Sequence, residues 1–171
     1  FKGKAAGTNS TTAMWTAGIH SALNNPQMVR HVYFCESAYD AMSFYQANRA
    51  KIDLPHSAFV SVGGALSNGQ VSGLMKHFCM AKAVDCFDND LPGRIYGMRM
   101  AALLDGKRLS VFQMGDNLRL EMEGKSFDMP VGKASVEELG KFIKLPDRIE
   151  VMKPPVNYKD WNDVVRGMPL E

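Results

Sequence analysis

Two aspartates have the spacing that could hold a divalent cation. Asp88 and Asp90 are separated by one residue and directly follow the apolar run Ala83–Phe87. Two carboxylates this close repel one another unless a proton or a cation lies between them. Mg²⁺ takes oxygen ligands and commonly uses one or two carboxylates together with substrate phosphates. The alternative is that Asp90 only caps a helix whose first turn contains Pro92.

A third carboxylate, Glu36, closes the apolar run His31–Glu36. Near a metal ion it could act as a general acid or base that moves a proton on a hydroxyl or a leaving oxygen. It could equally be solvated or face the N-terminus of the next helix. Asp40 lies one helical turn later, where it could reach the same site or serve only as the third residue of a capping box begun by Ser37.

Glycines and a basic residue accompany these carboxylates. Gly63 and Gly64 follow the run Ala58–Val62, and they permit positive φ and close approach of a phosphate to the backbone. A tight strand-to-helix turn needs the same freedom. Arg94 stands beside the aspartates and could bind phosphate through two hydrogen bonds, or could pair with Asp90.

A tryptophan in a polar, acidic turn marks the C-terminal segment Lys159-Asp160-Trp161-Asn162-Asp163. Trp161 could anchor the turn on the core while Asp160 or Asp163 faces the carboxylates. The alternative is a short helix capped by Asp160 or Asn162, with its two valines inward.

Apolar runs alternate with helical periodicity between these motifs. Strands are predicted at His31–Glu36, Ala58–Val62, Ala83–Phe87 and Leu109–Met114. Helices are predicted at Ala38–Ala50, after a cap at Ser67, and at Pro92–Leu104. This order predicts right-handed βαβ crossovers and an α/β, Rossmann-like, mostly parallel sheet of about four strands flanked by helices. Ligands bind at the carboxyl ends of such strands, so the carboxylates and the glycine pair should lie together.

The alternation stops after Met114. A hairpin is predicted over Leu118–Met129 with its turn at Glu123–Lys125, followed by a capped helix at Ser135–Leu145 and a strand at Ile149–Met152. Short strands or extended arms are predicted at Phe1–Ala5 and Thr12–Thr16. We predict one domain with an N-terminal extension (1–29), a core (30–114), a β-hairpin-plus-helix insertion (115–148) and a C-terminal strand with the KDWND motif (149–171).

Composition bounds the class of protein. The chain has 171 residues and a net charge of +2, too small to indicate or exclude a nucleic-acid partner. It has no apolar run of the roughly 20 residues that a membrane span needs, and no signal peptide. Cys35, Cys79 and Cys86 form no CxxC pair, which favours a reducing, cytoplasmic setting over disulfides or zinc. The chain opens on Phe1, and we expect it to be part of a longer protein.

The run FDNDLPGRIYGMRMAALL resembles the DxDxxG segment of Toprim domains, and CESAYDAMSFY resembles their primase-type glutamate motif. Ser37 stands where many members have Gly. With Lys-Asp-Trp-Asn near the end, the chain is similar to Toprim-like proteins of bacterial mobile elements. The family includes bacterial primases, type IA and type II topoisomerases, some nucleases and a recombination mediator.

The resemblance implies a role for each matched position. Asp88 and Asp90 would hold Mg²⁺, for which Mn²⁺ could substitute, and Glu36 would join them as a ligand and as the general acid or base. Nucleic acid would be the substrate, as DNA, a single strand or an RNA primer, placed with help from other domains of a longer chain. The residues in contact with substrate would be Gly63, Gly64, Arg94 and Lys159, supported by Asp40, Gly93, Asp160 and Asn162.

A primase-like activity is favoured over a topoisomerase or a nuclease, and no tyrosine has the diagnostic context that a topoisomerase needs. Two other classes stay open. The domain could be a non-catalytic nucleic-acid-binding or docking module, whose binding would survive loss of the carboxylates. It could also be a phosphohydrolase of the haloacid dehalogenase type, although that class expects a small hydroxyl residue after the second aspartate, where Leu91 and Pro92 stand.

Overall fold

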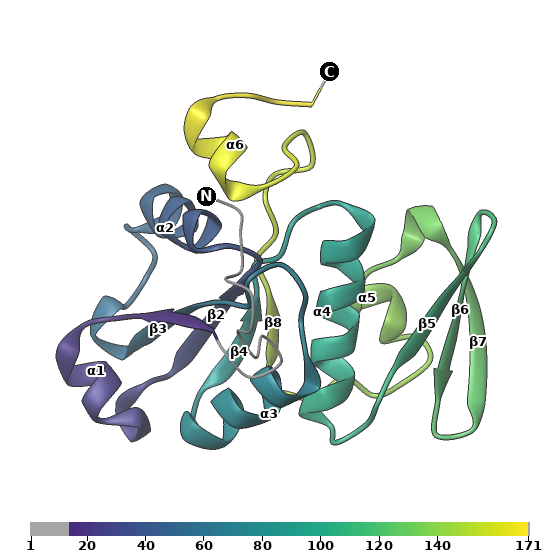
Figure 1. The fold of residues 1–171 in the computed structure, drawn as a ribbon, viewed down its shortest axis with the longest axis horizontal. Coiled ribbons are helices and arrows are strands. Elements are labelled where there is room, and N and C mark those ends of the chain that lie inside the picture. The colour runs from purple at the N-terminus through teal and green to yellow at the C-terminus, as the bar shows by residue number, and fades with distance from the viewer. Residues whose placement is uncertain (1–13, 171) are drawn as a thin grey trace, which may run out of the picture.

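The computed structural model describes residues 14–170 and contains two sheets (Figure 1). The larger sheet has five strands in the order β1-β3-β2-β4-β8. Its strands are β1 (Trp15–Ala17), β3 (Ser57–Ser61), β2 (His31–Cys35), β4 (Lys82–Asp85) and β8 (Ile149–Val151). All neighbours pair in parallel except β1, which runs antiparallel to β3. The predicted Rossmann-like, mostly parallel sheet is therefore confirmed.

Helices cover both faces of this sheet. The connections carry α1 (His20–Asn24), η1 (Pro26–Met28), α2 (Ala38–Asn48), η2 (Leu54–His56), α3 (Asn68–His77) and α4 (Leu91–Leu104). Successive strand residues point to opposite faces. Accordingly Val32 and Phe34 pack in the core with α3 and α4, while Tyr33 and Cys35 pack with α2 and with α6 (Trp161–Arg166).

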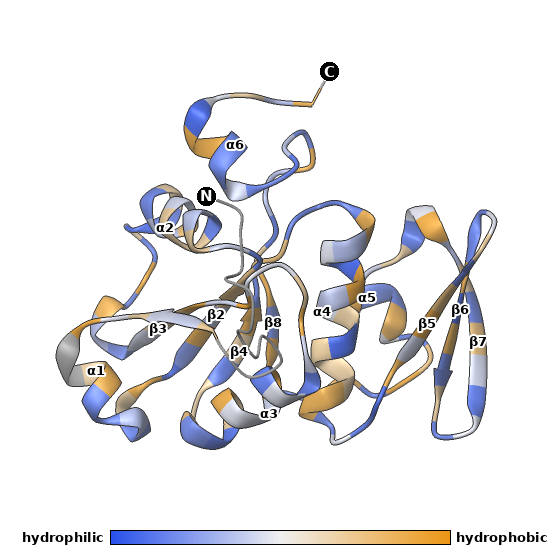
Figure 2. Cartoon of the chain, viewed as in Figure 1, coloured by the Kyte–Doolittle hydropathy of each residue, from blue (hydrophilic) through white to orange (hydrophobic). Residues whose placement is uncertain are grey.

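A second sheet packs on the far side of α4 (Figure 1). It is antiparallel, in the order β5-β6-β7, and η3 (Val131–Lys133) and α5 (Val136–Leu139) follow it. Its strands are β5 (Ser110–Met114), β6 (Asn117–Met122) and β7 (Lys125–Pro130). Apolar and polar residues alternate along β6 (Figure 2), and its buried residues face α4. The hairpin turn lies at Glu123–Gly124, where both residues have positive φ, as a two-residue loop of type I′ requires.

Two predictions about single elements were wrong. Leu109–Met114 was expected as the fourth parallel strand, but β5 belongs to the second sheet and β8 takes that place beside β4. Most of β5 is exposed, which suits the edge of an antiparallel sheet and not a strand covered on both faces. The helix expected over Ser135–Leu145 ends after Leu139, at Gly140, and glycine is a poor helix former.

At the N-terminal end, β1 overlaps only the end of the predicted arm Thr12–Thr16, and Phe1–Ala5 lies outside the described residues. The division into extension, core, insertion and C-terminal segment stays a prediction. Within residues 14–170 no helix is long and apolar enough to cross a membrane.

Candidate metal centre

The three predicted carboxylates come together beyond the carboxyl ends of the parallel strands. Glu36 directly follows β2, and Asp88 and Asp90 lie in the connection from β4 to α4. One oxygen from each of the three side chains lies within 4.8 Å of the other two. These are hard oxygen ligands of the kind that Mg²⁺ takes.

Asp88 carries the clearest sign that the cluster suits a cation. Its side chain is buried, and within the described residues its Oδ1 has no hydrogen-bond partner. Burial raises the pKa of Asp88 to about 8, and the charges of Asp40, Glu36, Asp160 and Asp90 contribute. A buried, unpaired carboxylate is costly unless a proton or a cation offsets its charge. The residues present therefore fit a divalent metal ion.

Asp90 begins α4 and also takes part in the cluster. Its Oδ1 accepts a hydrogen bond from Gly93 N at 3.0 Å, so it is the helix cap of the simpler interpretation. Its Oδ2 lies 3.6 Å from Lys159 Nζ. Gly93 lets this first turn approach Asp88, because a Cβ there would lie 2.8 Å from Asp88 N and still closer to Asp88 O. The spacing of the glycine after the aspartates therefore has a steric cause.

The glycine pair positions the backbone of Glu36. The N–H groups of Gly63 and Gly64 both donate to Glu36 O at 3.1 Å, and the hydroxyl of Ser61 donates to the same oxygen at 3.2 Å. Both glycines have positive φ, 73° and 103°, which other residues rarely adopt. This geometry favours the tight-turn interpretation of the pair over direct phosphate contact.

Asp40 also fits both of its interpretations, as a helix-capping residue and as a neighbour of the carboxylates. It completes the capping box of α2, since its carboxylate accepts from Ser37 N and its N–H donates to Ser37 Oγ. Burial raises the pKa of Asp40, hydrogen bonds from Ser37 oppose the rise, and the charge of Asp160 adds to it. Asp40 thus lies within electrostatic reach of the cluster while it caps the helix.

Asn89, for which no role was predicted, holds the C-terminal segment beside the cluster through hydrogen bonds. Its Nδ2 donates to Pro154 O at 3.0 Å and to Tyr158 O at 2.7 Å, and its N–H donates to Lys159 O at 2.7 Å. These bonds bring Lys159 beside Asp90. An asparagine between two aspartates was visible in the sequence, but its partners lie about 65 residues away in the chain.

Both interpretations of the KDWND segment describe part of what the structure shows. Trp161 anchors the segment on the core, and Asp160 both caps a helix and lies near the carboxylates. The indole Nε1 donates to Cys86 O at 3.1 Å, and the ring meets Phe44 edge-on at 5.0 Å. Asp160 caps α6 by accepting from Asp163 N at 2.8 Å, and its charge contributes to the raised pKa of Asp88. Among the described residues, no hydrogen bond joins the side chain of Asn162, the next residue of α6, to the carboxylates.

A buried ion pair lies under the loop that carries Asp88, and the sequence did not reveal it. Asp85 is fully buried, and its Oδ1 lies 2.6 Å from Lys153 Nζ and accepts from Phe87 N at 3.1 Å. Burial raises the pKa of Asp85, and the Lys153 charge opposes that rise. An aspartate inside the apolar run Ala83–Phe87 was a usable signal, but nothing in the sequence identifies its partner.

Arg94 lies near the buried ion pair of Asp85 and Lys153. It lines a cavity of about 760 Å³ together with Asp85, Lys153 and Glu137. Its Nε is buried without a hydrogen-bond partner in the described chain, and no ion pair joins Arg94 to Asp90 there. Of the two interpretations of Arg94, the pairing with Asp90 is therefore not formed, and contact with a substrate phosphate stays a prediction.

Comparison with protein families gives one match. A family model described as Toprim-like matches residues 33–125, more than half of the chain. The matched segment contains Glu36, the glycine pair, both aspartates and Gly93, and it ends at the hairpin turn of the second sheet. Comparison with curated proteins and with solved structures gives no match.

Proposed function

The chain belongs to the Toprim-like family, and on this premise we propose that it is the catalytic part of a primase-like enzyme that joins nucleotides. Membership of this family implies Mg²⁺-dependent nucleic-acid enzymology in general. The observation that carries the proposal is the convergence of Glu36, Asp88 and Asp90 within 4.8 Å, with a buried Asp88 oxygen that has no partner in the described residues.

In this proposal Asp88, Asp90 and Glu36 hold Mg²⁺. The bound ion would neutralise a phosphate of the substrate and orient it for in-line transfer. Glu36, only half-buried, would take the proton from an attacking hydroxyl or return one to a leaving oxygen. Gly63 and Gly64 would hold Glu36 in place, since both N–H groups bind its carbonyl.

Lys159 is the cation best placed to meet a substrate phosphate beside the carboxylates. Burial lowers the pKa of its ammonium, but the charges of Asp90, Asp88, Asp160 and Glu36 outweigh this and raise the pKa above its ordinary value. Lys159 therefore stays charged at neutral pH. Its side chain is about half-exposed, so a phosphate can reach it without opening the fold.

We further propose that the substrate is nucleic acid and that other domains of a longer chain help to place it. A cytoplasmic location also remains a proposal, based on the absence of disulfide and zinc cysteine patterns in the sequence.

The test is calorimetric titration of Mg²⁺, and of Mn²⁺ as a probe, into the wild-type chain and into Asp88→Asn/Asp90→Asn. We expect saturable binding in the wild type and none in the double variant, because both aspartates supply ligand oxygens. The control, Asp116→Asn/Asp147→Asn, removes two exposed carboxylates outside the cluster and should bind as the wild type does. Equal binding by the wild type and the Asp88/Asp90 variant would contradict the metal centre.

Glu36→Gln in a longer chain separates catalysis from docking. The variant should keep its nucleic-acid binding and lose nucleotide transfer. Nucleic-acid binding without transfer in the wild type, unchanged by loss of all three carboxylates, would support the docking alternative. Hydrolysis of a generic aryl phosphate would support the phosphohydrolase alternative.

A further inference from the structure

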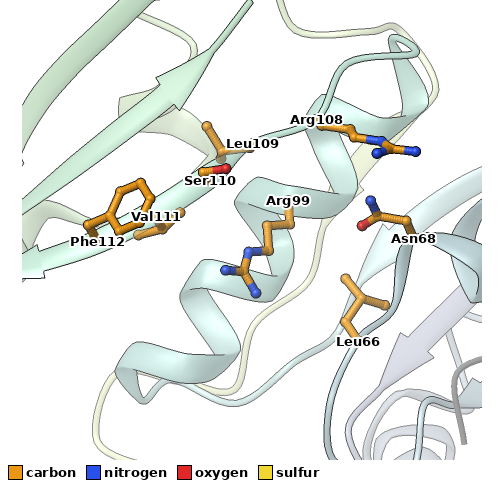
Figure 3. Close-up of a pocket in the computed structure, with 8 residues that line it drawn as sticks. All are labelled: Leu66, Asn68, Arg99, Arg108, Leu109, Ser110, Val111 and Phe112. Atoms are coloured by element: carbon orange, nitrogen blue, oxygen red, sulfur yellow. The ribbon is translucent and has the colours of Figure 1, made fainter.

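A pocket of about 350 Å³ lies between the loop before α3, the middle of α4 and the edge strand β5 (Figure 3). The residues of interest in its lining are Leu66, Asn68, Arg99, Arg108, Ser110 and Phe112. Ser110 and Phe112 alternate along β5, so their side chains share one side of the strand, and Arg108 lies just before it. The size is at the lower end of the range for small-molecule sites.

The pocket is positively charged and has an aromatic wall. Arg99 and Arg108 both line it, no carboxylate does, and within residues 14–170 neither guanidinium forms an ion pair. Phe112 is 50% exposed, although a large apolar ring is normally buried. Unpaired arginines beside an exposed aromatic ring are the combination that binds the backbone and the bases of single strands.

Two segments connect this pocket to the carboxylates. The loop after β3 starts where Gly63 and Gly64 bind Glu36 O, and it reaches the pocket at Leu66 and Asn68. Helix α4 starts at its cap Asp90, and Arg99 follows nine residues later, which is about 14 Å along a helix. A strand bound at both places would therefore bridge only a few nucleotides.

Tyr96 lies between the two places on α4. Burial raises the pKa of Tyr96, the charge of Glu36 raises it further, Arg99 lowers it, and Asp90 adds a smaller rise. The tyrosine is therefore within electrostatic reach of the carboxylates on one side and of the pocket arginine on the other. The charge near α4 therefore changes from negative at the metal centre, where the helix begins, to positive at the pocket beside its middle.

We propose that this pocket binds single-stranded nucleic acid a few nucleotides from the metal centre. Arg99 and Arg108 bind backbone phosphates, and an unpaired base stacks on Phe112. The proposal rests on the proposed function in one respect: the strand whose phosphate reacts at the carboxylates continues between α3 and β5. A paired base could not stack in this way, because its faces are covered by its neighbours in a duplex.

The experiment measures binding of a labelled oligothymidine, and of an oligouridine of equal length, by fluorescence anisotropy in a metal chelator over a series of salt concentrations. Arg99→Gln/Arg108→Gln should weaken binding about tenfold or more, and should make the slope of log K against log salt shallower by about 1.4. Phe112→Leu should weaken binding at least about fivefold, while Phe112→Tyr keeps a stacking ring and the affinity.

The matched control is Arg49→Gln/Lys51→Gln, which removes the same charge from exposed positions outside the pocket and should leave affinity within about twofold. An equal loss in this control, or no loss in the Arg99/Arg108 variant, overturns the proposal. Absence of any strand binding by the wild type at low salt overturns it as well. Arg108 and Phe112 are exposed, so single variants at these positions test the pocket without risk to the fold.

The metal centre and the strand-binding pocket can be refuted independently of one another. Without metal, Asp88→Asn/Asp90→Asn should bind the strand at least as tightly as the wild type, because the substitutions remove negative charge and leave the pocket residues in place. Absence of Mg²⁺ binding by the wild type, together with arginine-dependent strand binding, would refute the metal centre and leave the pocket. The ratio of oligothymidine to oligouridine affinity reports the combined effect of the 2′-hydroxyl and the C5-methyl group, and strand binding of either kind must depend on the arginines.

Discussion

At the scale of single residues, Asp88 lies in surroundings that oppose the charge of its carboxylate. Its carboxylate is buried near four other acidic side chains, and Lys159 brings a positive charge close to them. The folded protein without metal therefore favours the protonated form of Asp88. A carboxyl group in such surroundings costs stability at neutral pH, which is common where a site is built for a ligand.

We expect the metal-free protein to lose stability as pH rises from about 4 to about 8. The unfolded chain ionises Asp88 near pH 4, whereas the folded chain holds the proton until about pH 8. Between these values the folded state binds more protons than the unfolded state, so the free energy of unfolding falls with rising pH. Calorimetry in a chelator should show Asp88→Asn melting a few degrees above the wild type at pH 8 and close to it at pH 5.

The control for this effect is Asp116→Asn, an exposed aspartate outside the cluster, whose melting temperature should follow that of the wild type at every pH. Parallel curves for the wild type and Asp88→Asn would show that Asp88 ionises normally in the folded protein.

At the scale of elements, α4 begins at the metal centre, and two of its glycines allow the helix to pack closely against neighbouring residues. Gly93 lets its first turn approach the backbone of Asp88. Gly97, one turn later, lies against the buried carboxylate of Asp85, which binds Lys153 from the far end of the chain. The helix was predicted from periodicity and from Pro92, but its close approach to Asp85 depends on a strand neighbour that periodicity does not reveal.

Gly97→Ala should destabilise the protein by about 1–3 kcal/mol or more. A Cβ at this position would overlap Asp85 Oδ2 and lie 3.2 Å from a methyl group of Val136, so the helix or the ion pair must move. Urea denaturation measures the change. Gly73→Ala in α3 is the matched control: nothing lies within 4 Å of its Cβ, and it should stabilise by about 0.4–1 kcal/mol. Equal effects of the two substitutions would mean that Gly97 has no steric role.

At the scale of the whole molecule, α4 packs between two sheets. Met100 belongs to the core with the parallel sheet, while Met98, Ala101 and Ala102 belong to the core with β6 and β7. The helix that carries Asp90 thus buries side chains in both. We infer that the second sheet supports the metal centre, although it contributes none of its three carboxylates.

Leu120→Ala tests this coupling. Leu120 in β6 is fully buried, and its truncation should cost about 2–5 kcal/mol. We expect a single unfolding transition in urea, followed by circular dichroism and by fluorescence of the two tryptophans, Trp15 and Trp161, because α4 belongs to both cores. Leu170→Ala, at an exposed position, should change stability by less than about 0.5 kcal/mol. Two separate transitions in Leu120→Ala would contradict the coupling.

The sequence by itself determined the alternation of strands and helices, the caps at Ser37, Ser67 and Asp90, and the convergence of three carboxylates, because each depends on local periodicity or on the rule that parallel strands end together. Only the tertiary structure decided which strand completes the parallel sheet, the partner of Asp85 and the direction of Arg94. These depend on contacts between segments far apart in the chain. Strand pairing and buried charge pairs are selected by the packing energy of the whole fold, and short stretches of sequence do not encode that energy.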